Sequence, residues 1–389
     1  MQQRGGVGEI IEPSVGKTRG FLIAGCVCVL AVTLAAGLWP FAFRAKNKVY
    51  WDGSASGLHF GDPSIVVSDG TLAGIPARNG LSVEIWLQPD SNWASSTILS
   101  FYKPPTEPTL QVKQSGDDLL LTSAHGLHAK PERRNVFVDH AFRRGNAVLI
   151  TVVSKEDNLS IYVNAVLKKS VSGIQLRNDD FSGTLIIANA PYGNLSWKGI
   201  CRGLAFYNQA LDTEAIQRHY IAWGTKEQQI GEERPYTLYL FNEAQGERIH
   251  NQGQGGPDLV VPRDYKIPEP GFLVPFWKEF TPTIAYANDL AINVFGLVPL
   301  GFCFAALFSW TNGPSRSLWY TVMLGFCVSL TIEVLQGFMP TRFSGTTDLI
   351  TNTGGTAMGA WCYLNSRTQR WLRQSGLLRA KQSNSSAPG

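Results

Sequence analysis

The sequence predicts a mixed fold, in which an all-β sandwich is joined to an all-α unit of four transmembrane helices. Long apolar runs lie near both ends of the chain, and the polar middle carries short alternating runs that are typical of strands. With 389 residues the chain is long enough for two or three packed units. The formal net charge of +4 says little by itself.

Four membrane-spanning helices are expected, because about 20 apolar residues cross the hydrocarbon core of a bilayer. Their ranges are 21–43, 290–310, 318–339 and 346–364, of which the last is short and rich in glycine. Basic residues precede the first range, occur at Arg316 between the second and third, and follow the fourth. The positive-inside rule places these three regions in the cytoplasm, so the polar middle is expected outside it.

The tail after the last apolar run has five basic residues and no acidic ones. A nucleic-acid-binding tail is one interpretation. Directly after a membrane helix, a cytoplasmic anchor that contacts anionic lipid is the simpler one, and no nucleic-acid partner is expected.

The polar middle is expected to be all-β. The runs Leu81–Leu87 and Leu159–Val163 alternate, and Gly183–Ile187 is a short apolar strand candidate. Strand-like runs recur between turn signals without long helical patterns, which favours a sandwich. One helix is expected at Thr213–Trp223, after the N-cap candidate Asp212. Cys201 is the only cysteine of this region, so the region has no internal disulfide.

These patterns divide the chain into six parts. They are a cytoplasmic N-terminus at 1–20, the first transmembrane helix at 21–43, the extracytoplasmic sandwich at 49–265, an interfacial connector at 266–288, the helical unit at 289–364 and a basic cytoplasmic tail at 365–389.

Carboxylate–amide pairs spaced by one helical turn recur in the last three apolar segments. With the basic residue between the third and fourth segments, the candidate ligand- or ion-binding residues are Asp289, Asn293, Glu333, Gln336, Arg342, Asp348 and Asn352. Spacings of three and four residues place each pair on one helix face, and the predicted topology brings all three pairs to the outer side of the membrane. Ionisable groups in membrane segments often mark function.

Three acids face one arginine in this predicted site, so their charge needs a further partner. Proton uptake by Glu333, a divalent cation such as Mg²⁺ or Ca²⁺, or a ligand with a cationic group would each supply it. The alternative is structural, with amides bridging the helices while the acids pair with Arg342 and Lys278. Beyond this candidate cation, the sequence leaves the cofactor unknown.

The middle of the chain resembles the concanavalin A-like/laminin-G superfamily over about residues 49–224. The resemblance rests on the motifs at 81–89, 159–164 and 197–211. Similar domains bind carbohydrate, often with calcium, or serve as spacers, so a glycan- or protein-binding module is implied. The paired acids of related glucanases are missing. Where the family has Asn-Gly in a tight hairpin, this chain has Asn164-Ala165, and a local difference in that turn is expected.

The C-terminal segments resemble the VanZ-like family of bacterial membrane proteins over about residues 288–364. The matching motifs are Asp289…Asn293…Pro299-Leu300-Gly301, Ser329…Glu333…Gln336 and Arg342…Thr347-Asp348…Asn352…Gly355…Gly359. The resemblance implies a place in the bacterial cell envelope more firmly than a reaction. Gly355 and Gly359 are expected to be helix-packing residues, because small residues let helices approach closely.

The leading hypothesis is a multi-pass envelope protein without catalytic residues. Its sandwich would bind a glycan or a protein, and its polar site would recognise the headgroup of a membrane lipid or cell-wall precursor, with a link to glycopeptide resistance implied by the family name. One alternative is a membrane enzyme that uses Glu333 or Asp348 as a general base on a lipid-linked precursor. Another is a pure scaffold.

Overall fold

A computed structural model of the chain describes residues 15–53, 57–104, 108–125, 132–192, 196–225, 233–279 and 284–374. Most of the expected cytoplasmic N-terminus and the end of the basic tail lie outside these residues. The chain forms two compact units. The helical unit comprises residues 1–41, 271–338 and 343–389, and the β unit comprises residues 42–270 and 339–342.

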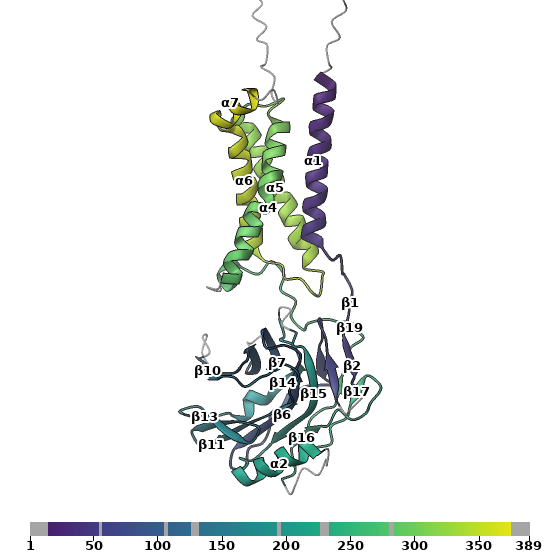
Figure 1. Ribbon diagram of the computed structural model, residues 1–389, viewed down its shortest axis with the longest axis vertical. Coiled ribbons are helices and arrows are strands. Elements are labelled where there is room, and N and C mark those ends of the chain that lie inside the picture. Colours follow the sequence, from purple (N-terminus) through teal and green to yellow (C-terminus); the bar gives the residue numbers. More distant parts are fainter. Residues whose placement is uncertain are drawn as a thin grey trace, which may run out of the picture. The chain divides into compact units, whose positions relative to one another are not determined.

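The β unit contains two large antiparallel sheets (Figure 1). The first has the strand order β10-β9-β8-β7-β14-β4-β18-β17, with β5 also paired to β14. Its strands are β4 (Val66–Ser68), β5 (Leu72–Ala73), β7 (Ala94–Tyr102), β8 (Leu110–Gly116), β9 (Asp118–His125), β10 (Glu132–Val138), β14 (Ser182–Ile187), β17 (Arg248–Ile249) and β18 (Leu259–Val260).

The second sheet has the order β13-β12-β11-β6-β15-β3-β2, with β16 also paired to β15. Its strands are β2 (Val49–Trp51), β3 (Leu58–Phe60), β6 (Leu81–Pro89), β11 (Val148–Lys155), β12 (Asn158–Val163), β13 (Val166–Ser172), β15 (Gly199–Tyr207) and β16 (Thr237–Tyr239). A short ribbon pairs β1 (Ala45–Lys46) with β19 (Asp264–Tyr265), and a 3₁₀ turn, η1, spans Asn178–Phe181.

The facing sides of the two sheets enclose one apolar core. Along β12 the buried residues alternate with partly exposed ones, as the sequence predicts. Phe101, Phe181 and Phe206 pack edge to face, with ring centroids 5.3–5.8 Å apart. The predicted all-β sandwich is therefore confirmed.

A second apolar layer lies on the outer face of the second sheet, where helix α2 (Thr213–Thr225) packs. Ala215, Ile216 and Trp223 of α2 contact apolar residues of β11 and β15. The carboxylate of Asp212 accepts a hydrogen bond from the backbone N–H of Ala215 at 2.8 Å, so Asp212 is the N-cap that the sequence predicts. The helix buries a sheet face that would otherwise contact solvent.

The hairpin between β12 and β13 differs from the sequence expectation. Asn164 and Ala165 both adopt positive φ angles, 53° and 61°, so alanine does not change the turn. The reason lies in two hydrogen bonds to Leu149. The backbone N–H of Asn164 donates to the backbone carbonyl of Leu149 at 2.8 Å. The backbone N–H of Leu149 donates to the side-chain oxygen of Asn164 at 2.9 Å.

The helical unit contains six helices among the described residues, two more than the four that the sequence predicts. They are α1 (Val15–Leu38), α3 (Phe276–Glu279), α4 (Ile284–Phe308), α5 (Pro314–Gln336), α6 (Thr346–Leu364) and α7 (Ser366–Gln374). The additional helices are α3 and α7, which are too short to give the long apolar runs used for the prediction. The predicted first helix reaches residue 43, but α1 ends before Pro40, since proline disfavours helix at the preceding residue.

Within the part of the chain that the structure describes, three helices are long and apolar enough to cross a membrane: α1 at Arg19–Leu38, α4 at Tyr286–Phe308, and α5 at Pro314–Gln336. Helix α6 has the bounds of the fourth predicted span, but its threonines and its polar pair Asp348 and Asn352 lower its hydropathy. The number of spans therefore stays a prediction.

Close approach of α4 and α6 depends on glycine. A Cβ atom on Gly355 would collide with the backbone carbonyl of Val294, and one on Gly359 would collide with that of Val298. Gly301 of α4 meets the carbonyl of Thr356 in the same way. Helix α6 packs against both α4 and α5, and α1 packs against α4 and α5 (Figure 1).

Candidate functional site

Two carboxylates cap the N-terminus of α6. Glu333 of α5 accepts a hydrogen bond from the backbone N–H of Gly345 at 2.8 Å. Glu279 of α3 accepts one from the backbone N–H of Thr347 at 2.9 Å and one from the Thr347 hydroxyl. The first N–H groups of a helix have no partner within the helix, and the helix dipole favours negative charge there. Both acids thus have a structural role in addition to any binding role.

The segment before α3 positions Glu279. Val274 forms a parallel bridge with Gly345, in which Val274 N–H donates to the Ser344 carbonyl at 3.0 Å and Thr346 N–H donates to the Val274 carbonyl at 2.8 Å. Gly345 has no side chain, and a Cβ atom there would collide with the Glu279 carboxylate. This glycine therefore lets the second carboxylate reach the helix.

Amides connect α6 to its neighbours. The Asn293 amide of α4 donates to the Asp348 carboxylate at 2.7 Å. One turn further along α6, the Asn352 amide donates to the Ser329 hydroxyl of α5 at 3.1 Å. Asn352 is 6% exposed, and its side-chain oxygen is buried without a hydrogen-bond partner among the described residues. This oxygen remains able to accept a hydrogen bond or to coordinate a cation.

We call Glu279, Asn293, Glu333, Asp348 and Asn352 the α6 polar cluster. The carboxyl of Glu333 lies near enough to those of Asp348 and Glu279 to interact with both electrostatically. The cluster thus gathers carboxyl and amide oxygens from α3, α4, α5 and α6. Such oxygens are the ligands that Mg²⁺ and Ca²⁺ prefer, and they also pair with ammonium groups.

Three predicted site residues lie apart from this cluster. Asp289 is exposed on α4 and has no polar partner among the described residues. Gln336 donates to the backbone carbonyl of Gly37 at 2.7 Å, which fastens α1 to α5. Arg342 belongs to the short segment that groups with the β unit, and is not placed in the cluster.

Glu279 is the one cluster member that the sequence did not predict as a site residue. It follows Phe276, Trp277 and Lys278 in the predicted interfacial connector. A carboxylate in a mainly aromatic and apolar segment next to a membrane helix is the signal that could have identified it.

Two stretches of the chain match different families. Residues 225–368 match the VanZ/LLP1 family, and residues 60–217 match the concanavalin A-like lectin/glucanases superfamily. The first match begins well before residue 288, where the recognised motifs begin. No curated protein matches the chain.

Solved structures resemble the chain only weakly. The botulinum neurotoxin type G receptor-binding domain is 15% identical, with a TM-score of 0.33, over 46% of this chain and 45% of that one. A heptameric SAP-like pentraxin from Limulus polyphemus is 14% identical, with a TM-score of 0.31, over 45% and 79%. A Bacteroides ovatus protein inferred to bind carbohydrate is 12% identical, with a TM-score of 0.36, over 54% and 58%. This chain thus spans less than half the length of the first.

Proposed function

We propose that this membrane protein, in which a VanZ-like region is joined to a concanavalin A-like sandwich, is a non-catalytic receptor of the bacterial cell envelope. Its sandwich binds a glycan outside the cytoplasm. Its α6 polar cluster holds the headgroup of a membrane lipid or of a lipid-linked cell-wall precursor at the outer side of the membrane.

The unpaired side-chain oxygen of Asn352 carries the headgroup proposal. It is buried where α6 meets Ser329 of α5, one helical turn from Asp348 on α6, and no described residue donates to it. A buried acceptor without a partner costs about 1–3 kcal/mol. A bound donor or cation removes that cost, whereas a purely structural amide would be expected to have both of its ends paired.

The charge of the cluster restricts the chemistry of the headgroup. Three carboxyl groups repel a bare phosphate, so a phosphate-bearing headgroup needs a divalent cation between itself and the protein. A headgroup with an ammonium group binds directly through charge-assisted hydrogen bonds. In both cases the helices hold the ligand at a depth where water competes little.

Catalysis is not part of this proposal. The residues from 271 to 389 contain no histidine, and Glu333 is already engaged by the backbone of Gly345. The glycan part of the proposal is supported by the match of residues 60–217 to the concanavalin A-like lectin/glucanases superfamily.

The headgroup proposal is tested by native mass spectrometry of the full chain in lipid nanodiscs. Wild type and the variants Glu333→Gln and Asp348→Asn are offered phosphatidylethanolamine and undecaprenyl pyrophosphate in Mg²⁺ or in EDTA. We expect each variant to retain about tenfold less of the preferred lipid than wild type does. For wild type, EDTA should abolish the retention of undecaprenyl pyrophosphate but not that of phosphatidylethanolamine.

Asp289→Asn is the matched control, because Asp289 is exposed on α4 and lies outside the cluster. Retention should stay within about twofold of wild type for this variant. Equal retention by wild type, Glu333→Gln and Asp348→Asn would disprove the headgroup proposal. An equal loss in Asp289→Asn would instead support the wider set of residues that the sequence predicts.

A further inference from the structure

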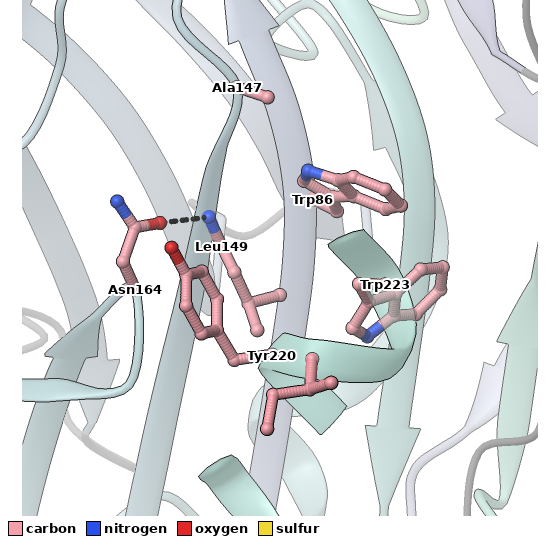
Figure 2. A pocket seen from close by; sticks show the side chains of 7 residues that line it. Trp86, Ala147, Leu149, Asn164, Tyr220 and Trp223 are labelled. Atoms are coloured by element: carbon pink, nitrogen blue, oxygen red, sulfur yellow. Dashed lines mark hydrogen bonds between the residues drawn. The ribbon is translucent and has the colours of Figure 1, made fainter. Parts of the chain in front are cut away.

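A cavity of about 290 Å³ lies on the outer face of the second sheet, beside α2 (Figure 2). Trp86 comes from β6, Leu149 from β11 and Asn164 from the β12–β13 turn, while Tyr220 and Trp223 come from α2. Figure 2 shows Tyr220 on one side of Leu149 and the two indoles on the other. The cavity therefore presents aromatic rings from both the sheet and the helix.

The sequence builds the indole pair through a glycine. Gly203 of β15 lies opposite Trp86 of β6, and a Cβ atom on Gly203 would collide with the Trp223 ring. The missing side chain leaves room for the Trp223 indole against the sheet. Its ring centroid lies 5.4 Å from that of Trp86, at an interplanar angle of 64°. The Trp223 indole is thus held between the backbone at Gly203 and the Trp86 ring.

Polar groups around the cavity have unused hydrogen-bonding capacity. The Trp223 indole N–H is buried and donates to no described atom. The Asn164 side-chain oxygen accepts from Leu149 N–H at 2.9 Å, which orients the amide and leaves its NH₂ without a described acceptor. Tyr220 is 38% exposed, and its hydroxyl has no partner among the described residues.

The lining contains no charged side chain. A charged ligand would lose its hydration in this cavity and would find no oppositely charged side chain there. The cavity therefore favours a neutral ligand. Its volume is just below the roughly 300–1,000 Å³ found for sites of drug-sized ligands, which suits a small ligand. The protein thus offers aromatic ring faces and a few neutral hydrogen-bond donors. These groups suit a saturated ring ligand with apolar C–H faces and with hydroxyl groups around its edge.

We propose that this cavity binds one or two pyranose rings of a neutral saccharide. Trp86 and Tyr220 supply the stacking faces, and the Asn164 amide donates to a sugar hydroxyl. The inference rests on the proposed glycan-binding role of the sandwich and locates it at α2. It needs no metal ion, because every contact is a ring face or a neutral hydrogen bond.

The test uses the full chain in nanodiscs, since maltoside detergents would themselves present a sugar. Binding of maltose, lactose and chitobiose, with galacturonic acid as the charged comparison, is measured by calorimetry. We expect at least one neutral disaccharide to bind and galacturonic acid not to bind. Trp86→Ala and Tyr220→Ala should each raise the Kd at least about tenfold, whereas Trp86→Phe keeps a ring and should cost less.

Tyr50→Ala is the matched control for Tyr220→Ala, because Tyr50 is an exposed tyrosine on β2 of the second sheet and does not line the cavity. Its Kd should stay within about twofold of wild type. If wild type binds a disaccharide and both cavity variants bind it equally well, the site is elsewhere and this inference fails while the glycan proposal stands. If wild type binds none of the three neutral sugars, both fail.

Discussion

The imidazole Nδ1 of His219 lies 3.0 Å from a carboxylate oxygen of Glu84, and both side chains are completely buried. His219 is on α2 and Glu84 is on β6, so the pair joins the helix to the sheet. The Glu84 carboxylate also accepts from the Tyr207 hydroxyl at 2.9 Å and from the Thr151 hydroxyl at 3.3 Å. On the other side of the imidazole, Nε2 lies 3.3 Å from Glu233.

The protonation of His219 should make the stability of this region depend on pH. Burial disfavours the imidazolium, but the carboxylates of Glu84 and Glu233 outweigh burial and raise the pKa of His219 above 6.5. This contribution is complete below about pH 6.5 and is lost as the pH rises through the raised pKa. The pKa of Glu233 is lowered from 4.5, against the effect of burial, by hydrogen bonds and by Arg218, so its contribution is lost in acid.

We therefore expect α2 to be most protected from hydrogen exchange, after correction for the intrinsic rate, between about pH 4.5 and pH 6.5. Protection should fall above this window. Glu84→Gln should flatten the decrease on the alkaline side, because the imidazolium then loses its buried counter-charge. Protection that rises steadily from pH 6 to pH 9 in wild type would contradict the assignment.

Removing the imidazole should destabilise the β unit strongly. His219→Ala leaves the buried Glu84 carboxylate without its cationic partner, and losses of this kind cost about 3–5 kcal/mol. His140→Ala is the control, since His140 pairs with Asp117 at 2.6 Å but its side chain is 80% exposed. The melting temperature of the β unit should fall for the first variant and stay nearly unchanged for the second. Equal melting temperatures would show that the buried pair adds no stability.

The glycine contacts between α4 and α6 give a second stability prediction. Gly355→Ala places a methyl group against the Val294 carbonyl and should destabilise the helical unit by about 1–3 kcal/mol. Gly354→Ala, at the neighbouring position, meets nothing within 4 Å and should be neutral or slightly stabilising. The two variants are compared by thermal unfolding in the same detergent. Similar behaviour of both would mean that α4 and α6 do not pack as described.

Native cysteines allow the position of α1 to be tested. The Cys26 thiol of α1 donates to the backbone carbonyl of Cys303 of α4 at 3.3 Å. We expect copper phenanthroline to join the two, so that the fragments stay linked after cleavage at a protease site inserted near residue 229. Cys26→Ser should abolish the link and Cys28→Ser should keep it, because Cys28 is exposed. A link that survives Cys26→Ser would argue against this helix pairing.

Local patterns predicted the elements of the β unit well. The alternating run from Leu81 forms β6, as predicted. The helix predicted after Asp212 is α2, which ends two residues beyond its predicted end. Burial on both faces of β6 was not predictable from alternation alone. Its outer residues Glu84 and Trp86 are covered by α2, which is more than 100 residues away in the chain. Local sequence carries no information on that pairing.

The candidate site was predictable to the extent that it follows helical periodicity. Spacing alone places Asp348 and Asn352 on one face of α6, and the structure joins them to Asn293 and Ser329. The rotation of each helix about its axis depends on packing, which the sequence does not reveal, so the exposure of Asp289 and the turn of Gln336 toward α1 were not predictable. The role of Glu279 depends on the bridge between Val274 and Gly345, a pairing of distant segments.

The side of the membrane on which the sandwich lies decides the glycan proposal, because the glycans of the assembled envelope lie outside the cytoplasm. Trp93 is 92% exposed on a loop of the sandwich and suits replacement by cysteine. Intact cells that express Trp93→Cys are treated with a membrane-impermeant maleimide and compared with cells that express the wild-type chain. Our account predicts labelling of the variant in intact cells at the level seen after permeabilisation. Labelling only after permeabilisation would place the sandwich in the cytoplasm and contradict the account.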